Sequence, residues 1–105
     1  METYLVKPEE REKFKSLIQR LLRYKKENQE LFKEVKSLKI FAQTFGGIAG
    51  AHIEMWEFGN MADLEKCWAK ENKDERFRRM HQEFLQLIEP VTFSINVWSE
   101  VAQSL

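Results

Sequence analysis

The chain is poor in several features that mark particular protein classes. With one cysteine, Cys67, among 105 residues, it has no pair for an internal disulfide bond. No segment approaches the ~18 consecutive apolar residues of a membrane-spanning helix. Residues 1–7 lack the basic stretch and apolar run of a secretory signal peptide. Lys plus Arg and Asp plus Glu balance at 17 each, and a neutral chain is a poor nucleic-acid binder, because phosphate neutralisation supplies most of that affinity. These absences predict a soluble, cytoplasmic protein that binds neither nucleic acid nor membrane.

Metal and cofactor motifs are also missing. His52, His81 and Cys67 are too far apart in sequence for the usual ligand spacing of a metal site. The glycine-rich segment 46–50 lacks the Lys-Ser/Thr of a phosphate-binding loop. We therefore expect no metal and no cofactor. The chain contains 43% hydrophobic and 32% charged residues, which is the composition of a globular protein. Its length suits one domain over residues 1–105.

The first 38 residues contain one short β-favouring segment and a long amphipathic pattern. Residues 2–7 predict a strand, and Pro8 predicts the start of a helix. Apolar residues then recur at helical spacing, at Phe14, Leu17, Ile18, Leu21 and Leu22. The helix either continues to about Ser37 or breaks near Asn28, and we favour the break. Its basic residues alternate with acids and are interpreted as a solvated surface: Arg11, Lys15, Arg20, Arg23 and Lys26.

The rest of the chain predicts three strands and an interrupted helix. Residues 39–45 and 48–58 are β-favouring and flank a Gly46-Gly47 turn. Asn60 suits the N-cap of a second helix, which Asp74 restarts after an interruption and which stops at Glu89-Pro90. Residues 91–101 alternate between apolar and polar side chains, which predicts a last strand.

This order predicts an α+β domain of ferredoxin-like type, β-α-β-β-α-β, with both helices on one face of an antiparallel sheet. We expect an apolar set to face the helices: Ile53, Met55, Val91, Phe93, Ile95 and Val97. The opposite face then receives a mixed polar and aromatic set: Tyr4, Phe41, Phe45, His52, Glu54, Trp56, Phe58, Thr92, Ser94, Asn96 and Trp98. The apolar area of so many aromatic side chains exceeds the few hundred Å² of apolar patch that a monomer usually exposes. The simplest cover is the same face of a second copy, and the sequence therefore predicts a homodimer.

The chain resembles the dimeric α/β-barrel superfamily in its layout and in a few segments. These are Gly46-Gly47 leading into the Ile-Glu-Met-Trp-Glu-Phe run of residues 53–58, then the capped helix at residues 60–65 and the restart at Asp74. The similarity is to NIPSNAP-like proteins and to antibiotic-biosynthesis-type monooxygenases. It implies a dimeric α/β barrel with a cavity between sheet and helices or between the two sheets.

Haem-binding members of that superfamily use a histidine on the second helix, where this chain has His81 preceded by Trp68. The haem-degrading members also have an asparagine on the first strand, which this chain lacks. The resemblance therefore does not extend to haem breakdown.

The candidate site lies on the sheet face that we expect to point away from the helices. His52 and Glu54 are two residues apart on one strand and could form an acid–base pair, with Glu54 as the base. Tyr4, Trp56, Asn96 and Trp98 are the candidate ligand-binding residues: rings to stack on a flat molecule, and an amide to hold an oxygen. Alternatively, all of them only fill a dimer interface. The predicted function is binding of a small, partly apolar molecule in a semi-polar cavity. A cofactor-free monooxygenase and a purely structural dimer remain the alternatives.

Overall fold

The sheet and helices follow one another in an α+β order. The computed structural model describes residues 1–47, 50–99 and 101. Its elements are β1 (Glu2–Leu5), a 3₁₀ turn (Pro8–Glu10), α1 (Arg11–Glu27), β2 (Val35–Ala42), β3 (Ala51–Phe58), α2 (Met61–Lys73), α3 (Glu75–Leu87), a second 3₁₀ turn (Pro90–Thr92) and β4 (Ser94–Ile95). The strands form an antiparallel sheet in the order β2-β3-β1-β4. This architecture is compatible with a ferredoxin-like fold.

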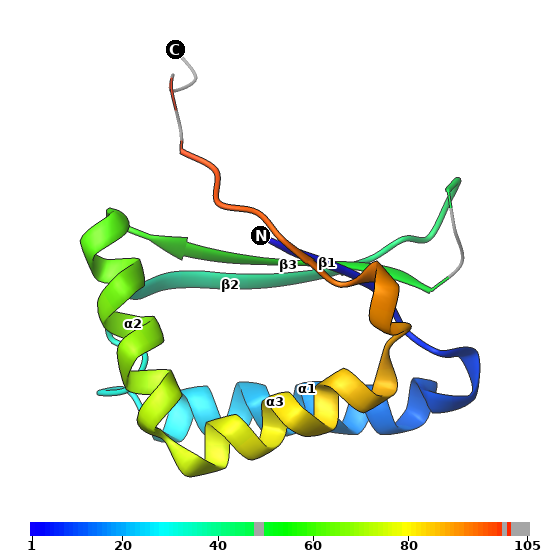
Figure 1. Ribbon diagram of the computed structural model, residues 1–105, viewed down its shortest axis with the longest axis horizontal. Coiled ribbons are helices and arrows are strands. Elements are labelled where there is room, and N and C mark those ends of the chain that lie inside the picture. Colours follow the sequence, from blue (N-terminus) through cyan, green and yellow to red (C-terminus); the bar gives the residue numbers. More distant parts are fainter. Residues whose placement is uncertain (48–49, 100, 102–105) are drawn as a thin grey trace.

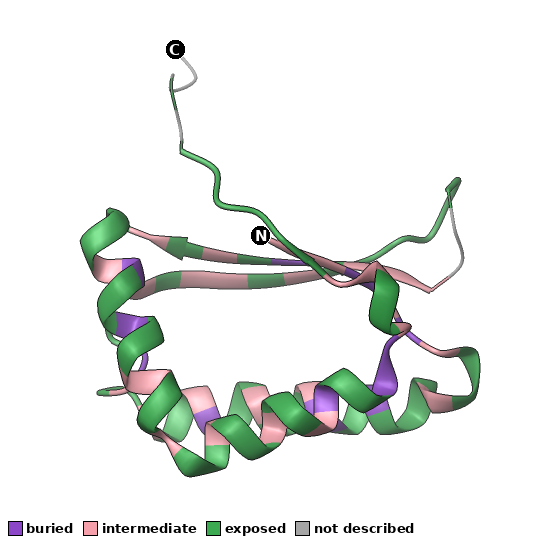
Figure 2. Ribbon diagram, in the orientation of Figure 1, coloured by how far each residue is buried: buried purple, intermediate pink, exposed green. Residues whose placement is uncertain are grey.

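Two layers make up the molecule. In Figure 1, α1 and α3 lie next to each other below one face of the sheet, and α2 runs from the end of the sheet down to this helix layer. The prediction that the helices cover a single face is confirmed. Figure 2 shows buried residues on the sides of the two layers that face each other. None of the described helices has the length and apolar character that crossing a bilayer demands.

The helix boundaries follow the predicted caps. α1 ends at Glu27, so the break near Asn28 is confirmed. The Asn60 side chain accepts a hydrogen bond from the Asp63 amide at 2.9 Å and starts α2. Asp74 does the same for α3, accepting from the Phe77 amide at 2.8 Å. A cap of this kind satisfies one of the free amides in the first helical turn, and it explains why the second helical region is divided in two.

The start of β2 differs from the prediction. The strand begins at Val35 and not at residue 39, although Val35 and Leu38 continue the helical spacing of the preceding apolar residues. A register shift between Val35 and Ser37 explains this pattern. Val35 lies opposite Phe58 and Leu38 opposite Trp56, so the bulge brings two residues three apart to the same face.

The core consists of two apolar clusters between the layers. The first joins β1 to α1 and α3 and contains Tyr4, Val6, Phe14, Leu17, Phe84, Leu87 and Ile88. The second lies near α2 and contains Tyr24, Phe32 and Cys67, with Trp56 and Phe58 packed against it. The two clusters place β1 and β3 against the helices through their even-numbered residues.

The predicted facing of β3 is therefore wrong. His52, Glu54, Trp56 and Phe58 point toward the helices, as does Tyr4, which is paired with His52 in the register. Ile53 and Met55, expected in the core, lie on the opposite face and are 37% and 45% exposed. Phe41 is paired with Ile53 and lies on this outer face, as predicted. Large aromatic rings on the other face outweigh the smaller apolar residues in deciding which side is buried.

The last strand is much shorter than residues 91–101. β4 pairs only with Glu2 and Thr3 of β1, because the Leu5 amide bonds to the Thr92 hydroxyl and not to a strand backbone. Phe93 packs against the first core cluster, as expected. Val91, Ile95 and Val97 are exposed, so the prediction that this set closes the core is wrong. Of the segments predicted as strand, residues 48, 49 and 100 lie outside the described part of the chain.

Candidate functional site

A buried carboxylate lies at the centre of the sheet. Glu54 of β3 is 5% exposed and faces the helix layer. The Tyr4 hydroxyl donates a hydrogen bond to one of its oxygens, and the Trp56 indole N–H donates to the other at 3.1 Å. Burial of a charge without such donors costs several kcal/mol. Two of the predicted ligand-binding residues, Tyr4 and Trp56, therefore hold the predicted base in place.

Two further carboxyl groups share this environment. Glu2 of β1 is directly opposite Glu54 in the register. Burial, followed by the charge of Glu54, raises the pKa of Glu2 from 4.5 to about 8. Burial likewise raises the pKa of Glu71 on α2 to about 7, and its charge contributes to the shift of Glu2. We call Glu2, Glu54 and Glu71 the inner carboxylate site. Near neutral pH it contains groups able to give or take a proton.

The predicted His52–Glu54 pair does not form. The two residues share a face, but the His52 Nδ1 lies 2.8 Å from the Gly50 carbonyl oxygen. The His52 ring stacks on Tyr4 with centroids 5.8 Å apart and meets Phe14 edge-on at 4.8 Å. His52 thus packs against two residues of the first core cluster, Tyr4 and Phe14, and is not the hydrogen-bond partner of Glu54.

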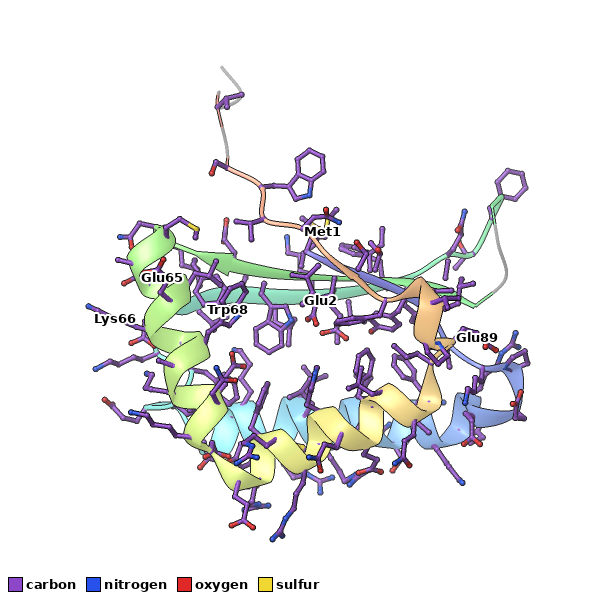
Figure 3. The ribbon with its side chains drawn as sticks, in the orientation of Figure 1. Met1, Glu2, Glu65, Lys66, Trp68 and Glu89 are labelled. Atoms are coloured by element: carbon purple, nitrogen blue, oxygen red, sulfur yellow. The ribbon has the colours of Figure 1, made fainter. Side chains whose placement is uncertain are left out.

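The helices that face the sheet carry two exposed aromatic side chains, His81 and Trp68. The centroids of the His81 ring on α3 and the Phe93 ring are 6.4 Å apart, and the charge of Glu54 acts on the His81 ring. His81 as a whole is nevertheless exposed. Burial lowers the pKa of His81 from its usual value. Figure 3 shows Trp68 projecting from α2 and Glu2 from β1 toward the space below the sheet, and Trp68 is 42% exposed. His81 and Trp68 therefore lie at the boundary between the interior and the solvent.

Two predicted residues lie outside this arrangement. Asn96 is exposed, and its backbone pairs with Met1. Trp98 is 75% exposed in the extended segment after β4, and within the described residues its ring contacts no other aromatic side chain. The structure therefore does not bring Asn96 or Trp98 to Glu54.

Glu2 and Glu71 were not among the site residues predicted from the sequence. A signal existed for both of them. Glu2 alternates with Tyr4 on one strand face, and Glu71 lies on α2 one turn after the fully buried Cys67. Burial and the nearby Glu71 raise the pKa of the Cys67 thiol to about 12, which keeps it protonated and unreactive near neutral pH. The described residues contain no group of three or more His, Cys, Asp or Glu side chains placed to bind a metal ion.

Comparison with known proteins adds no further constraint. No family model matches the chain, and neither a curated protein nor a solved structure does.

Proposed function

We propose that this chain binds a small, partly apolar molecule at the inner carboxylate site, as a homodimer similar to the NIPSNAP-like dimeric α/β-barrel proteins. The observation that supports this most is Glu54, a carboxylate 5% exposed that is fixed by two aromatic side-chain donors, Tyr4 and Trp56. Apolar walls with a few convergent polar groups are typical of small-molecule sites. The location replaces the outer sheet face that the sequence predicted.

The chemistry of the site favours ligands with a basic or hydrogen-bond-donating head group. Glu2 and Glu54 face each other, and the charge of Glu54 favours the protonated form of Glu2, so a cation between them would allow both to ionise. Aromatic rings of Trp56 and Trp68 offer an apolar surface for the remainder of such a ligand. An aromatic amine combines both features, whereas an aromatic acid would be repelled.

A pair of probes with the same ring tests this proposal. Benzylamine is expected to shift the Trp56 indole N–H signal and the β1 and β3 amide signals in an NMR titration, and benzoate is not. Glu54→Gln should abolish the benzylamine shifts, because the variant keeps the shape of the side chain and loses its charge. Glu57→Gln is the matched control, since Glu57 lies on the same strand and is exposed. Equal shifts in the two variants, or shifts limited to the outer helix surfaces, would contradict the proposed location.

The homodimer is proposed on the outer face of the sheet. Phe41 is 50% exposed there and lies opposite Ile53, while Met55, diagonal to Phe41, lies opposite Lys39. Three large apolar side chains on adjacent strands form a continuous patch of the kind that protein interfaces cover. A second copy that presents the same face would bury it by two-fold symmetry.

Light scattering is the direct test of the dimer. The expected mass is twice the 12.6 kDa of the chain. Met55→Glu should shift the protein to monomer, because a charge in a closed apolar interface costs several kcal/mol. Gln82→Glu adds the same charge at an exposed position on α3 and should leave the mass unchanged. A monomeric wild-type protein at micromolar concentration would refute the dimer.

The raised pKa values of Glu2 and Glu71 favour a second candidate, a cofactor-free monooxygenase. Both groups have a pKa close to neutral, about 8 and about 7, and could take a proton from a phenolic substrate. Oxygen consumption with phenolic compounds, lost in Glu2→Gln, would support this activity.

A further inference from the structure

A concave site lies between α1 and α3, separate from the inner carboxylate site. This groove has a volume of about 380 Å³ and is bordered by four arginines, two from each helix, above Tyr24 and Met80. The arginines are Arg20 and Arg23 of α1 and Arg76 and Arg79 of α3. We call it the arginine groove. Its volume is in the range of small-molecule sites.

The charge around the arginine groove is strongly unbalanced. α1 has seven basic and two acidic residues and α3 has three basic and two acidic ones, so these helices hold a net charge of +6 in a chain that is neutral overall. Glu27 and Glu83 are the acidic residues of the groove. Glu83 is paired with Arg20 at 2.5 Å, and Arg79 pairs with Glu75 at 2.5 Å. Within the described residues, no carboxylate oxygen lies within 4.0 Å of Arg23 or Arg76.

Arg76 is held in a defined position without a counter-charge. Its guanidinium carbon lies 4.9 Å from the centroid of the Tyr24 ring. Tyr24 is itself buried, and its hydroxyl donates to the Asp74 carboxylate at 2.6 Å, the same carboxylate that caps α3. A guanidinium that packs on an aromatic ring keeps its edge N–H groups free for an oxyanion. The groove therefore contains a pre-positioned fork of donors together with a second unpaired arginine.

We propose that the arginine groove binds the phosphate group of a small phosphorylated molecule. Guanidinium groups match the geometry of phosphate oxygens and bind them through paired hydrogen bonds. Arg23 and Arg76 come from two different helices, and a phosphate shared between them would supply the counter-charge that both lack. The concave shape and small volume favour a small ligand over a membrane surface, which needs a flat or convex basic face. The sequence predicted only a solvated surface for the basic residues of α1, whereas two of them, Arg20 and Arg23, border the proposed binding site.

Calorimetric titration with inorganic pyrophosphate tests the proposal, with sodium chloride at matched ionic strength as the reference. We expect one site per chain with a dissociation constant below about 1 mM. Arg23→Gln and Arg76→Gln should each weaken binding by about tenfold or more, which is the loss expected for a charge-assisted hydrogen bond. Arg76→Lys keeps the charge but loses the fork, and it should weaken binding severalfold.

Arg78→Gln is the matched control, because Arg78 lies on α3, is exposed and does not border the groove. It should retain the wild-type affinity within about twofold, since an exposed charge outside the site contributes little. An equal loss in Arg78→Gln, or the absence of pyrophosphate binding, would overturn the proposal. Binding to vesicles of anionic phospholipid that pyrophosphate fails to displace would also overturn it and assign the basic surface to a membrane.

Discussion

Replacement of Glu2 by Gln should stabilise the protein at neutral pH and remove much of its pH dependence. Glu2 is opposite Glu54 in the sheet, and the charge of Glu71 also acts on it. Burial and these two charges make ionisation of Glu2 unfavourable in the folded state. Glutamine keeps the length and hydrogen-bonding groups of the protonated carboxyl and has no proton to lose.

The sign follows from comparing the two states. In the unfolded chain Glu2 loses its proton near its usual pKa of 4.5, whereas in the folded protein its pKa is about 8. Between these values the folded state binds more protons, so the free energy of unfolding falls as the pH rises from about 4.5 to about 8. The difference is worth at most about 5 kcal/mol, because each tenfold change in proton affinity corresponds to about 1.4 kcal/mol. Solvent access to Glu2 reduces this, and we expect about 2–3 kcal/mol, a large part of the ~5–15 kcal/mol that stabilises a domain.

Urea unfolding at a series of pH values from 5 to 9 measures the effect. Wild-type stability should decline across this range, and Glu2→Gln should flatten the decline and exceed the wild type at the upper end. In Glu2→Gln a smaller decline in the free energy of unfolding should remain, because the pKa of Glu71 is also raised in the folded protein, to about 7. Glu65→Gln, at an exposed position on α2, should follow the wild-type curve. A wild-type protein whose stability is constant over this range, or a Glu2→Gln curve parallel to it, would refute the reasoning.

Four further substitutions test single contacts and the proposed dimer. Tyr4→Phe removes one of the two donors to Glu54 and should lower the free energy of unfolding by about 1.5–3 kcal/mol, measured by urea denaturation. Asp74→Ala removes the α3 cap and the acceptor of a buried tyrosine hydroxyl, and it should lower the melting temperature of the protein by several degrees, an effect of about 1–2 kcal/mol in calorimetry. Met55→Glu should dissociate the proposed dimer in light scattering, and Trp98→Glu should do the same only if the segment after β4 takes part in the interface.

The local features of the fold were readable from the sequence because they depend on neighbours along the chain. Asn60 and Asp74 each cap a helix through an amide three residues away, and the α1 pattern ends where its apolar spacing weakens at Asn28. The predicted strand at 91–101 failed for a different reason. Alternation shows that a segment could be a strand, but a strand forms only where a partner pairs with it in register, and within residues 91–99 β1 pairs in this way only with Ser94 and Ile95.

The assignment of sheet faces needed the tertiary structure. The period of two in β3 separates His52, Glu54 and Trp56 from Ile53 and Met55, and the sequence determined this division correctly. Which set faces the helices depends on register and on packing with residues far away in the chain. Glu54 is tolerated inside because donors are present on β1 and β3, and a carboxylate that looks solvent-exposed by residue type becomes the centre of the site. The sequence by itself determined the helix caps, the break after α1 and the division of β3 into two faces. The tertiary structure decided which face is buried, since burial of an ionisable group depends on partners that only folding brings into contact.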